Sequence, residues 1–177
     1  MEVGLIPWRN QPRFKWLESE QLIMSILRKS LDTDPATPAV AWGHLILRVS
    51  AGLMIFYIHG LHKLEGGIAY LQHGTAWTLA KEVTEMRFPA PVLSAFAATV
   101  VQFICSPMIA VGLFTRLNAA LLTGTLSVAI LQNLLAGRDP QLAILYVVVL
   151  FSLIFLGSGK FSLDAAMVSR KRQLALA

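Results

Sequence analysis

Four long apolar runs constrain this chain more than any other feature of its sequence. A helix that spans a bilayer needs about 20 predominantly apolar residues, within a range of roughly 17–25. Three runs reach this length, at residues 40–61, 91–113 and 117–135. The fourth, residues 141–156, is shorter and can span only if the bilayer thins or flanking residues help. The sequence therefore predicts an all-α membrane protein built as a bundle of four transmembrane helices.

The composition agrees with a lipid environment and excludes an ordinary soluble enzyme. Hydrophobic residues make up 55% of the 177 residues and charged residues 14%, whereas soluble domains have roughly 45–50% and about 25%. The mean hydropathy is +0.61. The net charge is +5, and its basic residues lie mostly toward the ends of the chain. This distribution is typical of a membrane protein with basic cytoplasmic ends and does not indicate nucleic-acid binding.

The lysine and arginine residues predict the orientation in the membrane. Ten of them lie before the first run, in the turn at 114–116 or after the last run, and four lie in the opposite loops. Basic residues gather on the cytoplasmic side of membrane proteins. We therefore expect both termini in the cytoplasm and the helices in the cell (inner) membrane. An even number of spans requires the same arrangement.

The segments outside the apolar runs suggest three parts. Residues 1–38 form a cytoplasmic extension, in which apolar side chains of 14–31 recur on roughly one helical face. This segment is either an amphipathic helix, which lies on the membrane or docks on a partner, or a frayed extension. Residues 39–166 form the four-helix membrane domain, and 167–177 form a basic cytoplasmic tail.

One sizeable loop is expected between the first two spans. It begins at His62, runs to Pro91 and includes a possible short helix over residues 75–86. A loop of this length with its own helix is often a cap or a binding element. We expect it to lie outside the membrane, where it could cover the outer mouth of the bundle.

Arg48 is the most informative single residue, because it lies inside the first apolar run. A charge at that depth costs at least about 2.5–3.5 kcal/mol, so its side chain must face the bundle interior and find a partner. We group it in a polar cluster with Gln102 and Asp164. Arg48 either anchors an anionic or quinone-like headgroup or forms an Arg–Asp tie between the first and fourth spans. The further candidate partners are Asn118, Gln132 and Asn133.

A second cluster, His59, His62 and Lys63, lies at the outer end of the first span. The two histidines share a helix face if the helix persists through Gly60. They could bind a metal, relay protons or hydrogen-bond a quinone carbonyl, or they could have a structural role at the interface. No third ligand stands at a fixed spacing, so we predict no metal site. The single Cys105 also excludes an internal disulfide.

Three motifs in this order resemble the DoxX family. The first is LILRVSAGLMIFYIHGLHKLEGG at 45–67, with an early arginine and an outer glycine and lysine. The second is FPAPVLSAFAATVVQFICSPMIAVGLFTRLNAALL at 88–122, with its leucine-x-threonine-arginine turn. The third is LGSGKFSLDAA at 156–166. The resemblance covers about residues 45–166.

The resemblance implies a four-span membrane protein and places Arg48, Lys63, Arg116 and Asp164 at motif positions. Several members of the family are associated with membrane-bound oxidoreductase systems. One branch belongs to the thiosulfate:quinone oxidoreductase of sulfur oxidisers, and another is linked to a complex that copes with oxidative stress. The family often has a glutamate in the middle of the second span, where this chain has Gln102. If that carboxylate carries protons in relatives, this chain has no equivalent group at position 102.

Two functional hypotheses follow. In the first, the chain is a subunit of a membrane-associated redox assembly that binds a quinone non-covalently. If it is an enzyme, it is then an oxidoreductase subunit that acts with quinone. In the second, it is a non-catalytic accessory or assembly subunit that docks and stabilises a larger membrane complex. Both give it the lipid bilayer and other membrane subunits as partners.

Overall fold

The computed structural model describes residues 20–22, 24 and 37–176. The chain divides into two compact units, Met1–Val40 and Ala41–Ala177. In the first unit, residues 20–22 and 24 are helical and exposed. The rest of the amphipathic helix predicted at 14–31 lies outside the described residues.

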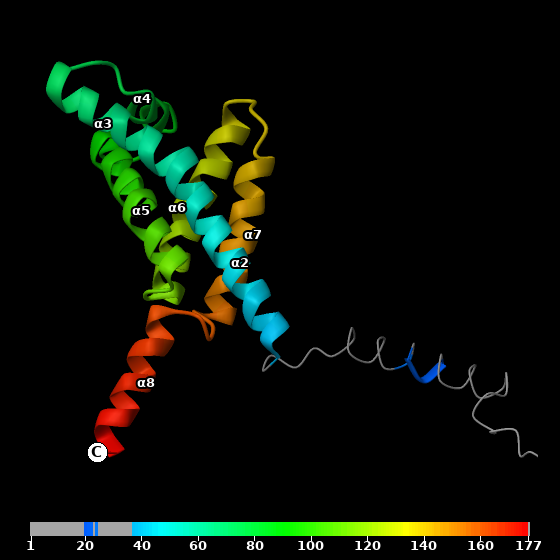
Figure 1. Ribbon diagram of the computed structural model, residues 1–177. Helices are drawn as coiled ribbons and strands as arrows, with labels where there is room; N and C mark the ends of the chain where they lie inside the picture. The colour runs from blue at the N-terminus through cyan, green and yellow to red at the C-terminus, as the bar shows by residue number, and fades with distance from the viewer. Residues whose placement is uncertain (1–19, 23, 25–36, 177) are drawn as a thin grey trace, which may run out of the picture. The chain divides into compact units, whose positions relative to one another are not determined.

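The second unit is helical, and Figure 1 shows its course. Every regular element among the described residues is a helix, which confirms the all-α prediction. The elements are α2 (Pro38–Met54), the π-helix η2 (Ile55–Leu61), α3 (His62–His73), α4 (Thr78–Glu85), α5 (Pro91–Val111), α6 (Thr115–Leu135), α7 (Gln141–Leu156) and α8 (Leu163–Leu176).

Within the described residues, three helices are long and apolar enough to cross a membrane: the continuous helix Pro38–His73, α5 and α6. The apolar helix α7 has 16 residues, fewer than a spanning helix normally needs. Within the described residues, the structure thus confirms the all-helical fold and contains three candidate spans. The fourth span stays a prediction.

The first long helix extends further than the sequence suggested. It runs for 36 residues through Gly66 and Gly67, and the chain leaves it only at Gly74, where φ is 62°. The loop predicted to begin at His62 is therefore wrong in its first part. A Cβ at Gly67 would lie 3.2 Å from the Trp77 ring and 3.3 Å from the Phe96 ring. The glycine pair thus allows close packing and does not end the helix. The helix predicted at 75–86 is present as α4.

Two apolar clusters hold the second unit together. The larger joins η2, α5, α6 and α7 through fully buried side chains such as Ile55, Ile109, Leu122 and Leu150. Gly52 lets α2 approach α5 closely, since a Cβ there would lie 2.7 Å from the Ser106 carbonyl oxygen. The smaller cluster packs α4 onto α5 through Trp77, Leu79, Ala80, Val83 and Ala95.

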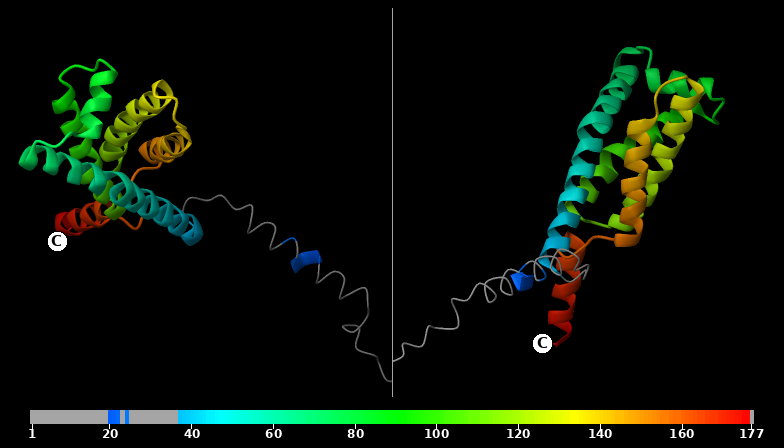
Figure 2. Two further views of the ribbon diagram at one scale, coloured as in Figure 1. Left: turned by 90° about the horizontal axis from the view of Figure 1, so that it is seen from above. Right: turned by 90° about the vertical axis from the view of Figure 1, so that its right-hand side faces the viewer.

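The bundle has two distinct ends, which Figures 1 and 2 both show. At one end lie α3, α4 and the connection between α6 and α7. At the other end lie the α5–α6 turn and the start of α8. We call these the α4 end and the α8 end. Each holds one group of the polar residues singled out above.

Candidate functional site

Arg48 is buried at the α8 end, where 2% of its surface is exposed. Its guanidinium donates hydrogen bonds to the carbonyl oxygens of Ser158 and Phe161, the latter at 2.6 Å. Both acceptors belong to the connection between α7 and α8, in which Gly157 and Gly159 have φ of 76° and 72°. Arg48 thus ties α2 to this connection through backbone groups.

Asp164 lies at the same end of the bundle and binds the turn between α5 and α6. Its carboxylate accepts hydrogen bonds from the backbone N–H groups of Phe114, at 3.0 Å, and Thr115, at 3.4 Å. Its own N–H donates to the Gly112 carbonyl at 3.1 Å. A carboxylate at these N–H groups stabilises the start of α6. Arg48 and Asp164 attract each other electrostatically, but no direct ion pair joins them among the described residues. The structural tie considered from the sequence therefore runs through backbone groups.

Gln102 does not belong to this end of the bundle. Its backbone carbonyl lies beside Gly60, where a Cβ would be 3.4 Å away, whereas Arg48 lies beside Gly112. The separation of ten positions from Gln102 to Gly112 corresponds to about 15 Å along α5. The polar cluster predicted from the sequence is therefore split, with Arg48 and Asp164 at the α8 end and Gln102 nearer the α4 end.

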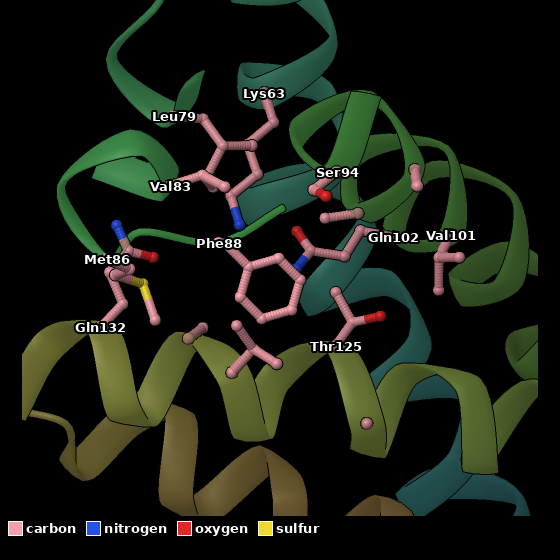
Figure 3. A pocket seen from close by; sticks show the side chains of 15 residues that line it. Lys63, Leu79, Val83, Met86, Phe88, Ser94, Val101, Gln102, Thr125 and Gln132 are labelled. Atoms are coloured by element: carbon pink, nitrogen blue, oxygen red, sulfur yellow. The ribbon is translucent and has the colours of Figure 1, made fainter. Parts of the chain in front are cut away.

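Gln102 lines a cavity of about 330 Å³ between α3, α4, α5 and α6, which we call the apolar cavity. Figure 3 shows Gln102 and Lys63 pointing into it, toward the Phe88 ring. The Gln102 side chain is fully buried, and neither its oxygen nor its nitrogen has a hydrogen-bond partner within the described residues. The apolar lining includes Leu79, Val83, Met86, Phe88, Val101 and Val128.

The apolar cavity has a mouth between α5 and α6. Ala97, Gly124, Val128 and Phe88 line the cavity and are also exposed. A helical surface of this composition in a bilayer faces acyl chains. The apolar cavity therefore opens onto an apolar surface of the bundle.

A second cavity of about 260 Å³ lies under α4, between the first long helix, α6 and α7, and we call it the polar cavity. Its lining contains six titratable side chains: His59, Lys63, Glu82, Arg138, Asp139 and Tyr146. The two cavities share Lys63, Leu79, Ala129 and Gln132 in their walls. The α4 end thus holds two adjoining compartments, and the one under α4 carries more ionisable side chains in its wall.

Hydrogen bonds to Glu82 fasten α4 over these compartments. Arg138 forms an ion pair with the Glu82 carboxylate at 2.8 Å, and the Gln132 side chain donates to the same carboxylate. The Tyr146 hydroxyl is buried and has no partner within the described residues. Its ring meets the His59 ring edge to face, with centroids 5.7 Å apart.

The π-helix decides which residues of the outer cluster reach the cavities. A π-helix has more residues per turn than an α-helix. The residue that shares the face of His59 is therefore Lys63, four positions later, and not His62, three positions later. His59 and Lys63 line the polar cavity, and His62 is exposed and does not. The sequence did not single out Glu82, Arg138 or Tyr146 for this site. Tyr146 gave one available signal, as a phenol within an aliphatic run.

The described residues contain no group of three or more histidine, cysteine, aspartate or glutamate side chains that could hold a metal ion. The polar cavity instead offers one imidazole, two carboxylates, two cationic groups and a phenol. Such a set suits hydrogen bonding and proton exchange better than metal coordination.

Comparison with known protein families identifies a match. The DoxX family model matches residues 43–135, which is more than half of the chain. No curated protein sequence and no solved structure matches significantly. The matched region includes Arg48, Lys63 and Gln102, and therefore covers residues from both ends of the bundle.

Proposed function

This chain belongs to the DoxX family and is an integral membrane protein, and on that basis we propose that it is a quinone-binding subunit of a membrane-associated redox assembly. In this proposal α7 is the fourth span, and both termini are cytoplasmic. The α4 end then faces the outer side of the inner membrane, and the electrons come from or go to a partner subunit.

The observation that carries the proposal is the Gln102 amide at the base of the apolar cavity. A buried polar group without a hydrogen bond costs roughly 1–3 kcal/mol. A ligand with a carbonyl or hydroxyl group would remove that penalty. The amide nitrogen can donate to a quinone carbonyl, and the amide oxygen can accept from a quinol hydroxyl. Gln102 therefore suits both oxidation states of such a ligand.

The rest of the apolar cavity fits the same class of ligand. Its volume of about 330 Å³ lies within the usual range for small-molecule sites, roughly 300–1,000 Å³. Lys63 offers a second donor, and Phe88 offers a ring face. An isoprenoid tail can leave through the mouth beside Gly124 into the lipid. When bound, a quinone would supply two-electron, two-proton carrier chemistry, and these residues would hold and orient its ring.

Filling the mouth tests the proposal. Gly124 has open space where a Cβ would stand, and so does Gly43, which is exposed on α2 away from the cavity. Gly124→Leu is expected to weaken binding of a short-tailed ubiquinone analogue at least tenfold, because the side chain enters the cavity. Gly43→Leu should leave the affinity within threefold of the wild type. The measurement is quinone quenching of tryptophan fluorescence in nanodiscs. Equal affinities for both variants would refute the site.

Gln102→Leu separates binding from stability. Leucine has a similar size and removes the unpartnered amide, so the variant should unfold at the same temperature as the wild type or a higher one. Its affinity for the quinone analogue should fall about tenfold, which corresponds to one hydrogen bond of about 1.4 kcal/mol. Thermal unfolding in detergent and the quenching titration measure the two effects. A variant with lower stability and unchanged affinity would assign Gln102 a purely structural role.

The accessory-subunit hypothesis predicts a different result at the level of the native complex. Purification in mild detergent, followed by mass spectrometry of proteins and a lipid extract, distinguishes the two. Quinone retained by the wild type and lost from Gly124→Leu supports the proposed function. A stoichiometric complex with no quinone in either preparation favours an assembly subunit.

A further inference from the structure

We infer that the polar cavity is an aqueous entry from the α4 end to Lys63, and that the Lys63 amine exchanges protons between this water and the apolar cavity. The role toward a quinone rests on the proposed function. The aqueous entry itself rests on the geometry of the second cavity alone.

The first argument is the concentration of charge. Ionisable side chains within membrane helices face water-filled cavities or one another, because hydrocarbon does not solvate them. Six titratable groups line the polar cavity, and two of them, Arg138 and Asp139, are exposed at the connection between α6 and α7. That connection is the opening through which solution enters.

The second argument is space with unsatisfied polar atoms. A cavity holds water when it is polar and large enough, and one water takes about 30 Å³ of liquid volume. The polar cavity has about 260 Å³, which is room for several molecules. The buried Tyr146 hydroxyl in its wall has no partner within the described residues. A water chain along the cavity would satisfy it.

The third argument is the freedom of Lys63. Its amine makes no hydrogen bond or ion pair to another described residue. Facing it are His59 from η2, Glu82 from α4, Arg138 and Asp139 from the α6–α7 connection, and Tyr146 from α7. Glu82 attracts Lys63 electrostatically, but its carboxylate is already bound by Arg138 and Gln132. The Lys63 amine can therefore serve either cavity.

The fourth argument comes from the apolar side. Lys63 is the sole ionisable residue in the described lining of the apolar cavity. Reduction of a quinone to a quinol consumes two electrons, here delivered one at a time by a one-electron carrier of a partner subunit, and two protons, for which the Lys63 amine must be reprotonated from water once. Among the described lining residues, only Lys63 can pass protons from water to this cavity.

Cysteine labelling tests the entry without any redox activity. In a Cys105→Ala background, Lys63→Cys is treated with a small, charged, membrane-impermeant methanethiosulfonate. Lys81→Cys, on the exposed face of α4, is the accessible control. Thr125→Cys lines only the apolar cavity and is the matched internal control. We expect labelling at 63 and 81 and at least tenfold slower labelling at 125.

The labelling outcomes separate this inference from the proposed function. Failure to label position 63 while 81 reacts would overturn the aqueous entry, whatever the quinone affinity. Equal rates at 63 and 125 would also overturn it, because water would then enter both cavities. Protection of the Lys63→Cys thiol by the short-tailed ubiquinone analogue supports both proposals. Labelling at 63 without protection keeps the aqueous entry and counts against quinone in the apolar cavity.

Discussion

Arg48→Leu is expected to detach the α7–α8 connection from α2 and so destabilise the α8 end of the bundle. The guanidinium is almost fully buried and donates to two carbonyl groups of the α7–α8 connection. Hydrogen bonds to a charged group contribute about 1.5–3 kcal/mol each, so the free energy of unfolding should fall by roughly 3–6 kcal/mol. The measurements are accumulation in membranes and thermal unfolding of the purified protein.

Arg48→Lys provides the graded control. Lysine keeps the charge but replaces the planar fork with one ammonium group, which cannot reach two separate carbonyls with the same geometry. We expect Arg48→Lys to lower the free energy of unfolding, but by less than Arg48→Leu does. Normal accumulation and an unchanged unfolding temperature in Arg48→Leu would show that the tie is dispensable.

Gly112→Ala, at the end of α5, should also destabilise the α8 end of the bundle. Gly112 has a φ of 78°, and a Cβ there would stand 2.5 Å from the Arg48 Nη1 atom and 2.6 Å from the Ser162 Cβ. The left-handed backbone costs roughly 1–2 kcal/mol for a residue with a side chain. The clash adds to this, because Arg48 cannot move without losing its carbonyl partners. We expect a loss of unfolding free energy close to that of Arg48→Leu.

Gly74→Ala isolates the backbone part of that effect. Gly74 has a φ of 62° at the end of α3, and nothing lies within 4 Å of the position of its Cβ. Its substitution should therefore lower stability only by the backbone cost. Thermal unfolding of the two variants side by side measures the difference. Equal decreases in stability for the two variants would mean that the contact between Gly112 and Arg48 does not contribute to stability.

The sequence predicts the helical fold well because apolar length is a strong local signal. The runs at 91–113 and 117–135 correspond to α5 and α6 within two residues. Burial of Arg48 also follows from the sequence, since a charge in an apolar run has no other place to go. Its partners do not follow, because they are backbone carbonyls, and every residue has one.

The candidate site was less predictable, because it depends on how helices meet. The sequence singles out Gln102 but groups it with Arg48 and Asp164, and only the structure shows that its amide lacks a partner within the described residues. Glu82 and Tyr146 lie far apart in the sequence and line one cavity through the packing of α4 and α7. The π-helix has no sequence signature that we recognised, and it turns His62 away from the face that His59 and Lys63 share.

The apolar helices of the bundle differ greatly in length. The first long helix has 36 residues, which correspond to roughly 50 Å, whereas the 16 residues of α7 correspond to about 24 Å. The hydrocarbon core measures about 30 Å. If α7 is the fourth span, as we propose, lipids beside it are drawn thinner than those beside the long helix, which then tilts or projects beyond the hydrocarbon. Such an uneven annulus favours neighbours with short helices along the α7 side, where shared thinning lowers the energy of the membrane.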